Sequence, residues 1–148
     1  MKIKIIYTVI LLSFLCGKIK AEDKFLSLKK NTVNVRYCPE FKCPVKYTYK
    51  KINLPVKIID KKENFRKIID LKKNSGWIHI SQLKQPISFI ILENKILLKK
   101  PSLFSRPIIR LEKGRLLVVK KCQSEWCYVK TGSYKGWVKT DKIWGDVN

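Results

Sequence analysis

The stretch Gly76-Trp77-Ile78 returns sixty residues later as Gly136-Trp137-Val138, and this recurrence divides the chain. Upstream of it, Leu54-Pro55-Val56-Lys57-Ile58-Ile59 matches Arg115-Leu116-Leu117-Val118-Val119 at an offset of 61, at which Phe65 also falls opposite Trp126. Val33-Asn34-Val35-Arg36 matches Ile96-Leu97-Leu98-Lys99 at an offset of 63. Because the order of these features is kept, the sequence predicts two copies of one unit of about 50 to 60 residues.

Both copies carry the pattern of β-strands. Residues 52–59 are rich in β-branched side chains, and residues 65–69 and 126–130 partly alternate between apolar and polar. Turn signals separate these runs, at Asn74-Ser75-Gly76, Lys113-Gly114 and Thr131-Gly132-Ser133. Residues 88–98 are apolar enough for a helix, but their Ile-Ile and Ile-Leu-Leu runs fit strands at least as well. We therefore expect an all-β chain.

Four segments are expected: a signal peptide at residues 1–21, a first domain at 22–84, a linker at 85–94 and a second domain at 95–148. Lys2 and Lys4 precede 13 uncharged residues, and Ala21 offers a cleavage point, which is the layout of an export signal. The uncharged run is shorter than the roughly 20 apolar residues of a membrane span. We expect a periplasmic or secreted protein that touches the membrane only through an uncleaved signal.

The five cysteines favour disulfides. Cys16 lies in the expected signal, and the other four form two pairs of equal spacing, Cys38 with Cys43 and Cys122 with Cys127. An even count in an exported chain indicates disulfides, and local pairing is the simplest of three connectivities. A four-cysteine zinc site is the alternative, although its ligand pairs usually have a spacing of C-x2-C.

The chain is strongly basic, with 33 Lys and Arg against 11 Asp and Glu and a formal net charge of +22. Losing the four lysines of the expected signal would lower this charge to +18. Only five of the basic residues are arginines, and lysine is the poorer group for bidentate recognition of phosphate or bases. The charge indicates attraction to anionic surfaces, or a solvated face that keeps a β protein soluble. Aromatic residues among the lysines also suit single-stranded nucleic acid, but the export signal argues against that partner.

Taken together, these features resemble bacterial SH3-like domains, and most closely a family of exported proteins with two such domains in tandem. The resemblance rests on four stretches: Val33-Asn34-Val35-Arg36, Tyr47-Thr48-Tyr49, the pair Cys122 to Cys127 that ends in Trp-Cys, and Trp144-Gly145. It implies two small five-stranded barrels and a binding role in attachment to the cell wall. One departure is Tyr37-Cys38-Pro39-Glu40-Phe41-Lys42-Cys43, where the family has a small glycine-containing turn.

Catalytic chemistry is weakly signalled. His79 is the only histidine, and its place on a strand favours a partly buried structural residue over a general base, since Lys139 holds the equivalent position in the second copy. The acidic residues form no cluster with metal-ligand spacing, and there is no glycine-rich phosphate loop. We expect a non-enzymatic chain without cofactor or metal, although an enzyme that uses His79 stays open.

The aromatic residues supply the candidate ligand contacts. Trp77, Trp137, Trp126 and Phe65 are expected to fill the barrels, because a large ring is a natural plug for a small core. Five aromatic residues in or near turns are the better surface candidates: Tyr37, Phe41, Tyr47, Tyr49 and Tyr134. The expected ligand is peptidoglycan or its peptide stems, and the alternative is an envelope or secreted scaffold that binds other proteins.

Overall fold

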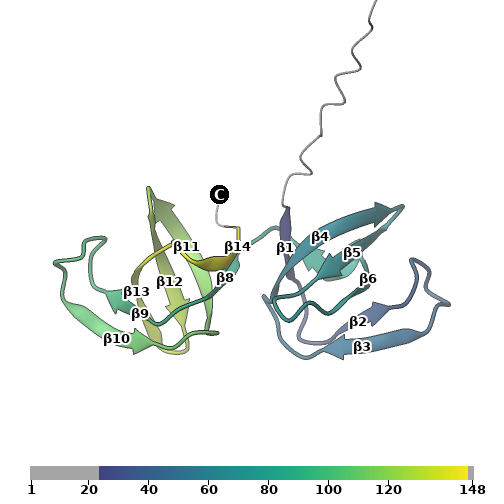
Figure 1. Cartoon of the computed structure of the whole chain (residues 1–148), viewed down its shortest axis with the longest axis horizontal. Helices are drawn as coiled ribbons and strands as arrows, with labels where there is room; N and C mark the ends of the chain where they lie inside the picture. The colour runs from purple at the N-terminus through teal and green to yellow at the C-terminus, as the bar shows by residue number, and fades with distance from the viewer. Residues whose placement is uncertain (1–23, 147–148) are drawn as a thin grey trace, which may run out of the picture.

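The computed structural model describes residues 24–146, and nearly all of the ordered elements are β-strands (Figure 1). The first half contains β1 (Phe25–Leu28), β2 (Val33–Arg36), β3 (Val45–Tyr49), β4 (Pro55–Lys62), β5 (Phe65–Ile69), β6 (Ser75–His79), the 3-10 helix η1 (Ile80–Gln82) and β7 (Leu83–Lys84). The second half contains β8 (Ser88–Ile91), β9 (Lys95–Leu98), β10 (Pro107–Leu111), β11 (Leu116–Gln123), β12 (Trp126–Thr131), β13 (Tyr134–Lys139) and β14 (Ile143–Gly145). The expected signal peptide lies outside the described residues.

The two halves form two antiparallel sheets with the same strand order. The first runs β3-β2-β6-β5-β4-β1-β7 and the second β10-β9-β13-β12-β11-β8-β14, so that each strand has its equivalent seven elements later in the strand numbering. The all-β fold with two tandem domains is confirmed. Each sheet has seven strands where five were expected, because short strands add to the free edge of β4 and of β11.

The connection between the domains is shorter than the linker expected at residues 85–94. Strand β8 occupies part of that range and pairs with β11 and β14 of the second sheet. All four of its residues are buried, which explains why this run lacks the alternation of a half-exposed strand. Only residues 85–87 separate β7 from β8.

Each sheet wraps a small apolar core. Seven buried residues form the first: Leu28, Val33, Val35, Val56, Ile68, Ile78 and Leu83. Eight form the second: Phe89, Ile91, Leu97, Leu111, Leu117, Cys127, Val129 and Val138. Of the four rings expected to fill the barrels, Phe65, Trp126 and Trp137 are buried, but outside these two clusters, and Trp77 is only partly buried.

The repeated glycine explains which way the neighbouring tryptophan points. A Cβ on Gly136 would lie 2.8 Å from the backbone oxygen of Leu98, and one on Gly76 would collide with a methyl carbon of Val35. The glycines therefore face the inside, where neighbouring strands come close. Since side chains alternate along a strand, the residue after each glycine faces the outside and the next one faces the core.

The register of β9 differs from the one predicted. Arg36 pairs with Trp77 and Leu98 pairs with Trp137, which sets the offset between β2 and β9 at 62 rather than 63. A slip of one residue moves side chains to the opposite face. Ile96 is accordingly 53% exposed, and Lys95 takes the position that Val33 holds in the first core.

A chain of polar contacts joins the two domains. The Ile87 amide donates to Ser27 Oγ at 3.1 Å, the hydroxyls of Ser27 and Ser88 lie 3.2 Å apart, and Ser88 Oγ donates to the Asn53 carbonyl. Both serine side chains are fully buried. Hydrogen-bonded groups in a water-free contact hold their geometry, because breaking them would leave unpaired polar atoms.

Trp144 on β14 makes a second link between the domains. Its indole N–H donates to the Pro55 carbonyl at 3.1 Å, and its ring meets the ring of Phe25 edge to face, with 5.1 Å between centroids. The ammonium group of Lys73 lies 5.8 Å from the same ring. The C-terminal Trp-Gly stretch therefore fastens the second domain to the first.

Candidate binding site

The outer face of the second sheet carries a cluster of large apolar side chains. Leu98 on β9, Trp126 on β12 and Trp137 on β13 are each about nine-tenths buried, with Tyr128 packed against them. Tyr128 lies directly opposite Trp137, and their ring centroids are 5.5 Å apart. Because Cys127 and Val129 alternate with these residues and point into the core, the cluster lies on the far face of the sheet.

Lysines cover the rings of this cluster. Lys121 Nζ lies 5.5 Å from the Trp137 ring and 5.9 Å from the Tyr128 ring, and Lys139 Nζ lies 5.9 Å from Trp126. These distances are those of cation–π contacts, each worth about 0.5 to 1 kcal/mol at exposed sites. The aromatic rings of this face therefore lie largely covered, with positive charge close to them.

A pocket of about 280 Å³ opens beside this cluster. Five apolar residues form its wall: Ile96, Leu98, Leu103, Trp126 and Val138. Leu103 belongs to the loop between β9 and β10 and is 68% exposed, whereas its neighbour Phe104 is fully exposed and does not line the pocket. Leu103 therefore lines the pocket, whereas Phe104, the exposed apolar residue beside it in the same loop, does not.

Charges of both signs line the same pocket. Lys95, whose side chain is only 7% exposed, places its ammonium 3.0 Å from Asp141 and 3.4 Å from Glu93. Lys139, also at the pocket, pairs with Glu125 at 3.4 Å. The hydrogen bond from Lys95 lowers the pKa of Asp141, and the one from Lys142 is the main cause that lowers the pKa of Glu93. Both carboxylates stay ionised at neutral pH.

The outer face of the first sheet also carries aromatic residues, but a loop packs over them. Phe65, Trp77 and His79 share the outer face of β5 and β6, opposite Ile68 and Ile78 in the core. The disulfide between Cys38 and Cys43, whose Cα atoms are 5.8 Å apart, closes the β2–β3 loop.

The closed loop places Phe41 on this face. The ring of Phe41 packs on Phe65 at 5.3 Å and on His79 at 4.7 Å. The guanidinium of Arg36 donates to the Cys43 carbonyl at 2.7 Å and holds the loop. Since Phe65 is equivalent to Trp126, the loop of the first domain covers the position that the pocket adjoins in the second.

The structure pairs the cysteines as the spacing favoured. Cys122 and Cys127 lie directly opposite each other on β11 and β12 and form the second disulfide, with 4.1 Å between Cα atoms. No group of three or more metal-ligating side chains occurs within residues 24–146. Over the same residues, no helix is long and apolar enough to cross a membrane.

His79 has a local structural role. Its Nδ1 accepts the Ser81 amide at 3.2 Å and lies 2.8 Å from Ser81 Oγ, at the start of η1. A serine hydroxyl thus stands beside the histidine, which the sequence pattern did not indicate. The backbone amide shares the same nitrogen, which is the arrangement of a helix cap.

The five predicted contact residues do not converge on one site. Tyr37 is 62% exposed with Lys46 5.6 Å from its ring, and Phe41 is 63% exposed on the disulfide loop. Tyr134, 45% exposed, begins β13 in the second domain. Tyr47 and Tyr49 are half-buried against the first core, so they are structural as well as accessible.

Tyr47 and Tyr49 belong to a hydrogen-bonded group around Asp70. The Tyr49 hydroxyl donates to Asp70 Oδ2 at 2.9 Å and lies 3.3 Å from the Tyr47 hydroxyl. Asp70 also accepts the Lys72 and Asn74 amides, each at 2.9 Å. Burial first, and then the hydrogen bonds of its hydroxyl with Tyr47 and Asp70, raise the pKa of Tyr49.

Sequence reasoning missed the pocket residues Leu98, Leu103 and Lys95. The repeated Gly-Trp was the signal that could have indicated this face. Where neighbouring strands come close, the glycine lies on the inner face of the sheet, and the tryptophan after it therefore lies on the outer face.

Comparison with known proteins gives a family and a partial likeness. A family model described as the bacterial SH3 domain matches residues 29–85 and 93–145, more than half of the chain. Among solved structures, NlpC2 and NlpC1 from Trichomonas vaginalis match at 14% and 13% identity, both with a TM-score of 0.38. Each match covers 82% of this chain but only 48% and 45% of the other, so the chain spans about half their length. No curated protein matches the chain.

Proposed function

Because the chain belongs to the bacterial SH3 domain family, we propose that it is an exported, non-enzymatic binding protein that recognises peptidoglycan through its peptide stems. Domains of this family often bind cell-wall components or proteins. The observation that carries the proposal is the pocket of the second domain, with an apolar wall and both signs of charge.

The pocket suits a short peptide with free carboxylate and amino groups. Leu98, Leu103 and Trp126 supply apolar surface for a small side chain, Lys139 supplies a cation, and Asp141 supplies an ionised carboxylate. Its volume of about 280 Å³ lies just below the range of typical ligand pockets, about 300 to 1,000 Å³. It would hold one or two residues of a peptide stem at a time.

Two features support export and a binding role without catalysis. The disulfides are compatible with an extracytoplasmic protein, and they agree with the expected signal peptide. The Nδ1 of His79 accepts the Ser81 amide at the start of η1, and this capping contact supports a structural role for the histidine. A His79→Ala variant that stayed folded but lost a measured hydrolytic activity would contradict the non-enzymatic assignment.

A protein-interaction scaffold is the second candidate. Phe104 is fully exposed in the loop between β9 and β10, next to the 68% exposed Leu103. A protruding aromatic ring is typical of a residue that inserts into a partner protein. The two candidates assign different importance to these neighbouring residues, because only Leu103 lines the pocket.

The test is co-sedimentation of the protein with insoluble peptidoglycan at low and at high salt. We expect binding that persists at high salt, is lost in Leu103→Ser and is kept in Phe104→Ser. Circular dichroism of the three proteins would show that all are folded. Binding that vanishes with salt, or that neither substitution affects, would refute the pocket as the site. Loss in Phe104→Ser alone would favour the scaffold.

A further inference from the structure

A basic groove lies between the two domains, away from the aromatic pocket. One hollow of about 360 Å³ is lined by Lys51 of the first domain and by Arg115, Leu116 and Thr131 of the second. A second hollow of about 360 Å³ also contains Leu116 and Thr131 in its lining, together with Asn53, Lys120 and Lys130. The two shared residues make these hollows neighbours in one groove.

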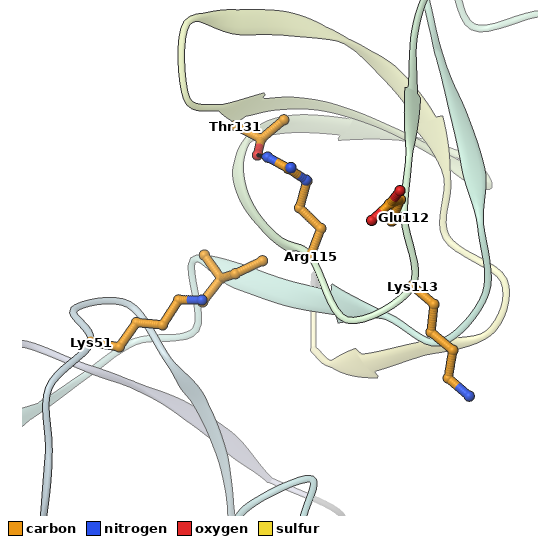
Figure 2. Close-up of a pocket in the computed structure, with 6 residues that line it drawn as sticks. Lys51, Glu112, Lys113, Arg115 and Thr131 are labelled. Atoms are coloured by element: carbon orange, nitrogen blue, oxygen red, sulfur yellow. Dashed lines mark hydrogen bonds between the residues drawn. The ribbon is translucent and has the colours of Figure 1, made fainter.

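The charge of this groove is almost entirely positive. Lys51, Arg115, Lys120 and Lys130 are exposed, and none of them forms an ion pair with another residue in the described part of the chain. Figure 2 shows Lys51 reaching from the first domain toward the second, while Arg115 points toward Thr131, with its guanidinium 3.5 Å from the hydroxyl. Lys113 points away from this space, and Glu112 is the one carboxylate among the described residues that line it.

The internal repeat shows which of the groove's cations have no equivalent in the first domain. Strands β4 and β11 correspond at an offset of 61, as do β5 and β12. At that offset, the groove residues Arg115, Lys120, Lys130 and Thr131 replace Leu54, Ile59, Ile69 and Asp70 of the first domain. Three apolar residues have become cations and one carboxylate has become a hydroxyl. Two other lining residues change the opposite way, because Glu112 and Val118 stand where the first domain has Lys51 and Lys57. The repeat therefore shows that Arg115, Lys120 and Lys130 are cations particular to the second domain.

Backbone geometry helps to place two of these lysines. The pairing of β11 with β12 is irregular between Val119 and Lys121, which leaves Lys120 as the extra residue of a bulge. A β-bulge bends its strand and re-aims the side chain of the extra residue. Lys130 lies opposite Val118, which also lines the second hollow.

The first-domain side of the groove is held in place. Ser88 Oγ donates to the carbonyl of Asn53, two residues after Lys51, and Trp144 donates to the carbonyl of Pro55. The segment that carries Lys51 is therefore tied to the second domain at two points. The groove is formed before any ligand arrives, which lowers the entropic cost of binding.

We propose that this groove binds the phosphate groups of an anionic polymer, at a site separate from the peptide pocket. Three of the four cations are lysines, which act as point charges and suit a flexible chain, while Arg115 can engage two oxygens of one phosphate. The Thr131 hydroxyl adds a neutral donor. Among the described residues, no aromatic side chain lines either hollow, so the groove has no surface on which nucleic-acid bases could stack. It would therefore bind the charged groups along the polymer.

The test measures the affinity of the whole protein for inorganic polyphosphate across a salt series. The groove variant is Lys51→Gln, Arg115→Gln, Lys120→Gln and Lys130→Gln combined. The matched control is Lys61→Gln, Lys62→Gln, Lys99→Gln and Lys100→Gln, which removes four exposed positive charges outside both hollows. Because all eight residues are exposed, both variants should fold, and thermal unfolding checks this.

We expect the groove variant to lose roughly tenfold or more in affinity, and the control to lose about twofold or less. Each phosphate contact should contribute about −0.7 to the slope of log affinity against log salt, by analogy with single-stranded nucleic acid. With four such contacts, the slope of log affinity against log salt should be about −3 for the native protein and much shallower for the groove variant. Equal losses in both variants would overturn the proposal, because the attraction would then come from overall charge.

Two further arms distinguish phosphate recognition in the groove from general attraction to polyanions and from binding in the peptide pocket. Polyglutamate that bound as tightly as polyphosphate would overturn the assignment to phosphate. Peptidoglycan co-sedimentation of the groove variant should match that of the native protein, because Leu103 and its pocket are untouched. A groove variant that kept polyphosphate binding would refute the groove and leave the peptide pocket unaffected.

Discussion

Replacing Gly136 by alanine tests the close approach of β9 and β13 on which the outward-facing tryptophan depends. The added Cβ would lie 2.8 Å from Leu98 O, Leu97 Cγ and Ile108 Cδ1. Ordinary contact begins near 3.4 Å, so each neighbour must move by about 0.6 Å or more. Leu97 is fully buried and Leu98 O belongs to the backbone, so neither can move aside as a surface side chain would.

Two opposing effects set the magnitude. Overpacking of this kind costs about 1 to 3 kcal/mol. Alanine also restricts the unfolded chain, which favours the folded state by about 0.4 to 1 kcal/mol. The clash is the larger effect, and we expect Gly136→Ala to lower the free energy of unfolding by about 1 to 2 kcal/mol. For a domain of this size, each kcal/mol corresponds to a fall in Tm of about 4 to 8 °C.

Thermal and urea unfolding, followed by tryptophan fluorescence, would measure the change. Gly76→Ala should behave alike, since its Cβ would lie 3.0 Å from the backbone oxygen of Arg36. Gly132→Asn is the control: Gly132 has a φ of 57° and open space around it, and asparagine tolerates that conformation. If Gly136→Ala were as stable as the native protein, the reasoning from strand proximity would be refuted.

Three further variants test stability. Tyr49→Phe removes a donor to the buried Asp70 carboxylate and should lower the free energy of unfolding, measured in urea, by about 1 to 2 kcal/mol. An unchanged urea midpoint would mean that water replaces the lost hydroxyl. Lys95→Met keeps an unbranched side chain in the core, so it should change the free energy of unfolding by less than about 1 kcal/mol at neutral pH. A loss above about 3 kcal/mol would show that the ion pair of Lys95 with Asp141 is essential. Lys95 lowers the pKa of Asp141, so this ion pair stabilises the folded state above the unfolded pKa of Asp141, and its contribution is lost as the pH falls through the lowered value. In an acid titration of unfolding, Lys95→Met should therefore lose less stability below about pH 4 than the native protein. Replacing both residues of the Cys122–Cys127 disulfide by alanine should cost roughly 2 kcal/mol, and no change in Tm would contradict the value expected from loop closure.

The sequence alone was enough to determine the repeat, and with it the two domains and most of their strands. Strands β4 and β11 keep the predicted offset of 61, and β6 and β13 keep the offset of 60. The disulfides also followed from spacing, because cysteines separated by 5 positions around a tight turn meet without long-range information. These features depend on neighbours along the chain.

Only the tertiary structure decided which face of each strand is buried. Alternation predicts that Trp137 and Val138 point in opposite directions, but it does not say which one enters the core. The close contact of Gly136 with β9 settles this, and β9 is distant from it along the chain. The register of β9, which buries Lys95 instead of Ile96, has the same origin.

The candidate sites were beyond reach of the sequence for the same physical reason. The pocket joins Leu103 to Trp126, and the groove joins Lys51 to Arg115, pairs of residues that are distant along the chain. Spacing along a strand determines the period of a pattern, whereas proximity between such residues depends on the packing of whole sheets and on the serine and tryptophan contacts that join them. The charges and rings of this protein were visible in its sequence, but packing alone brought them together into sites.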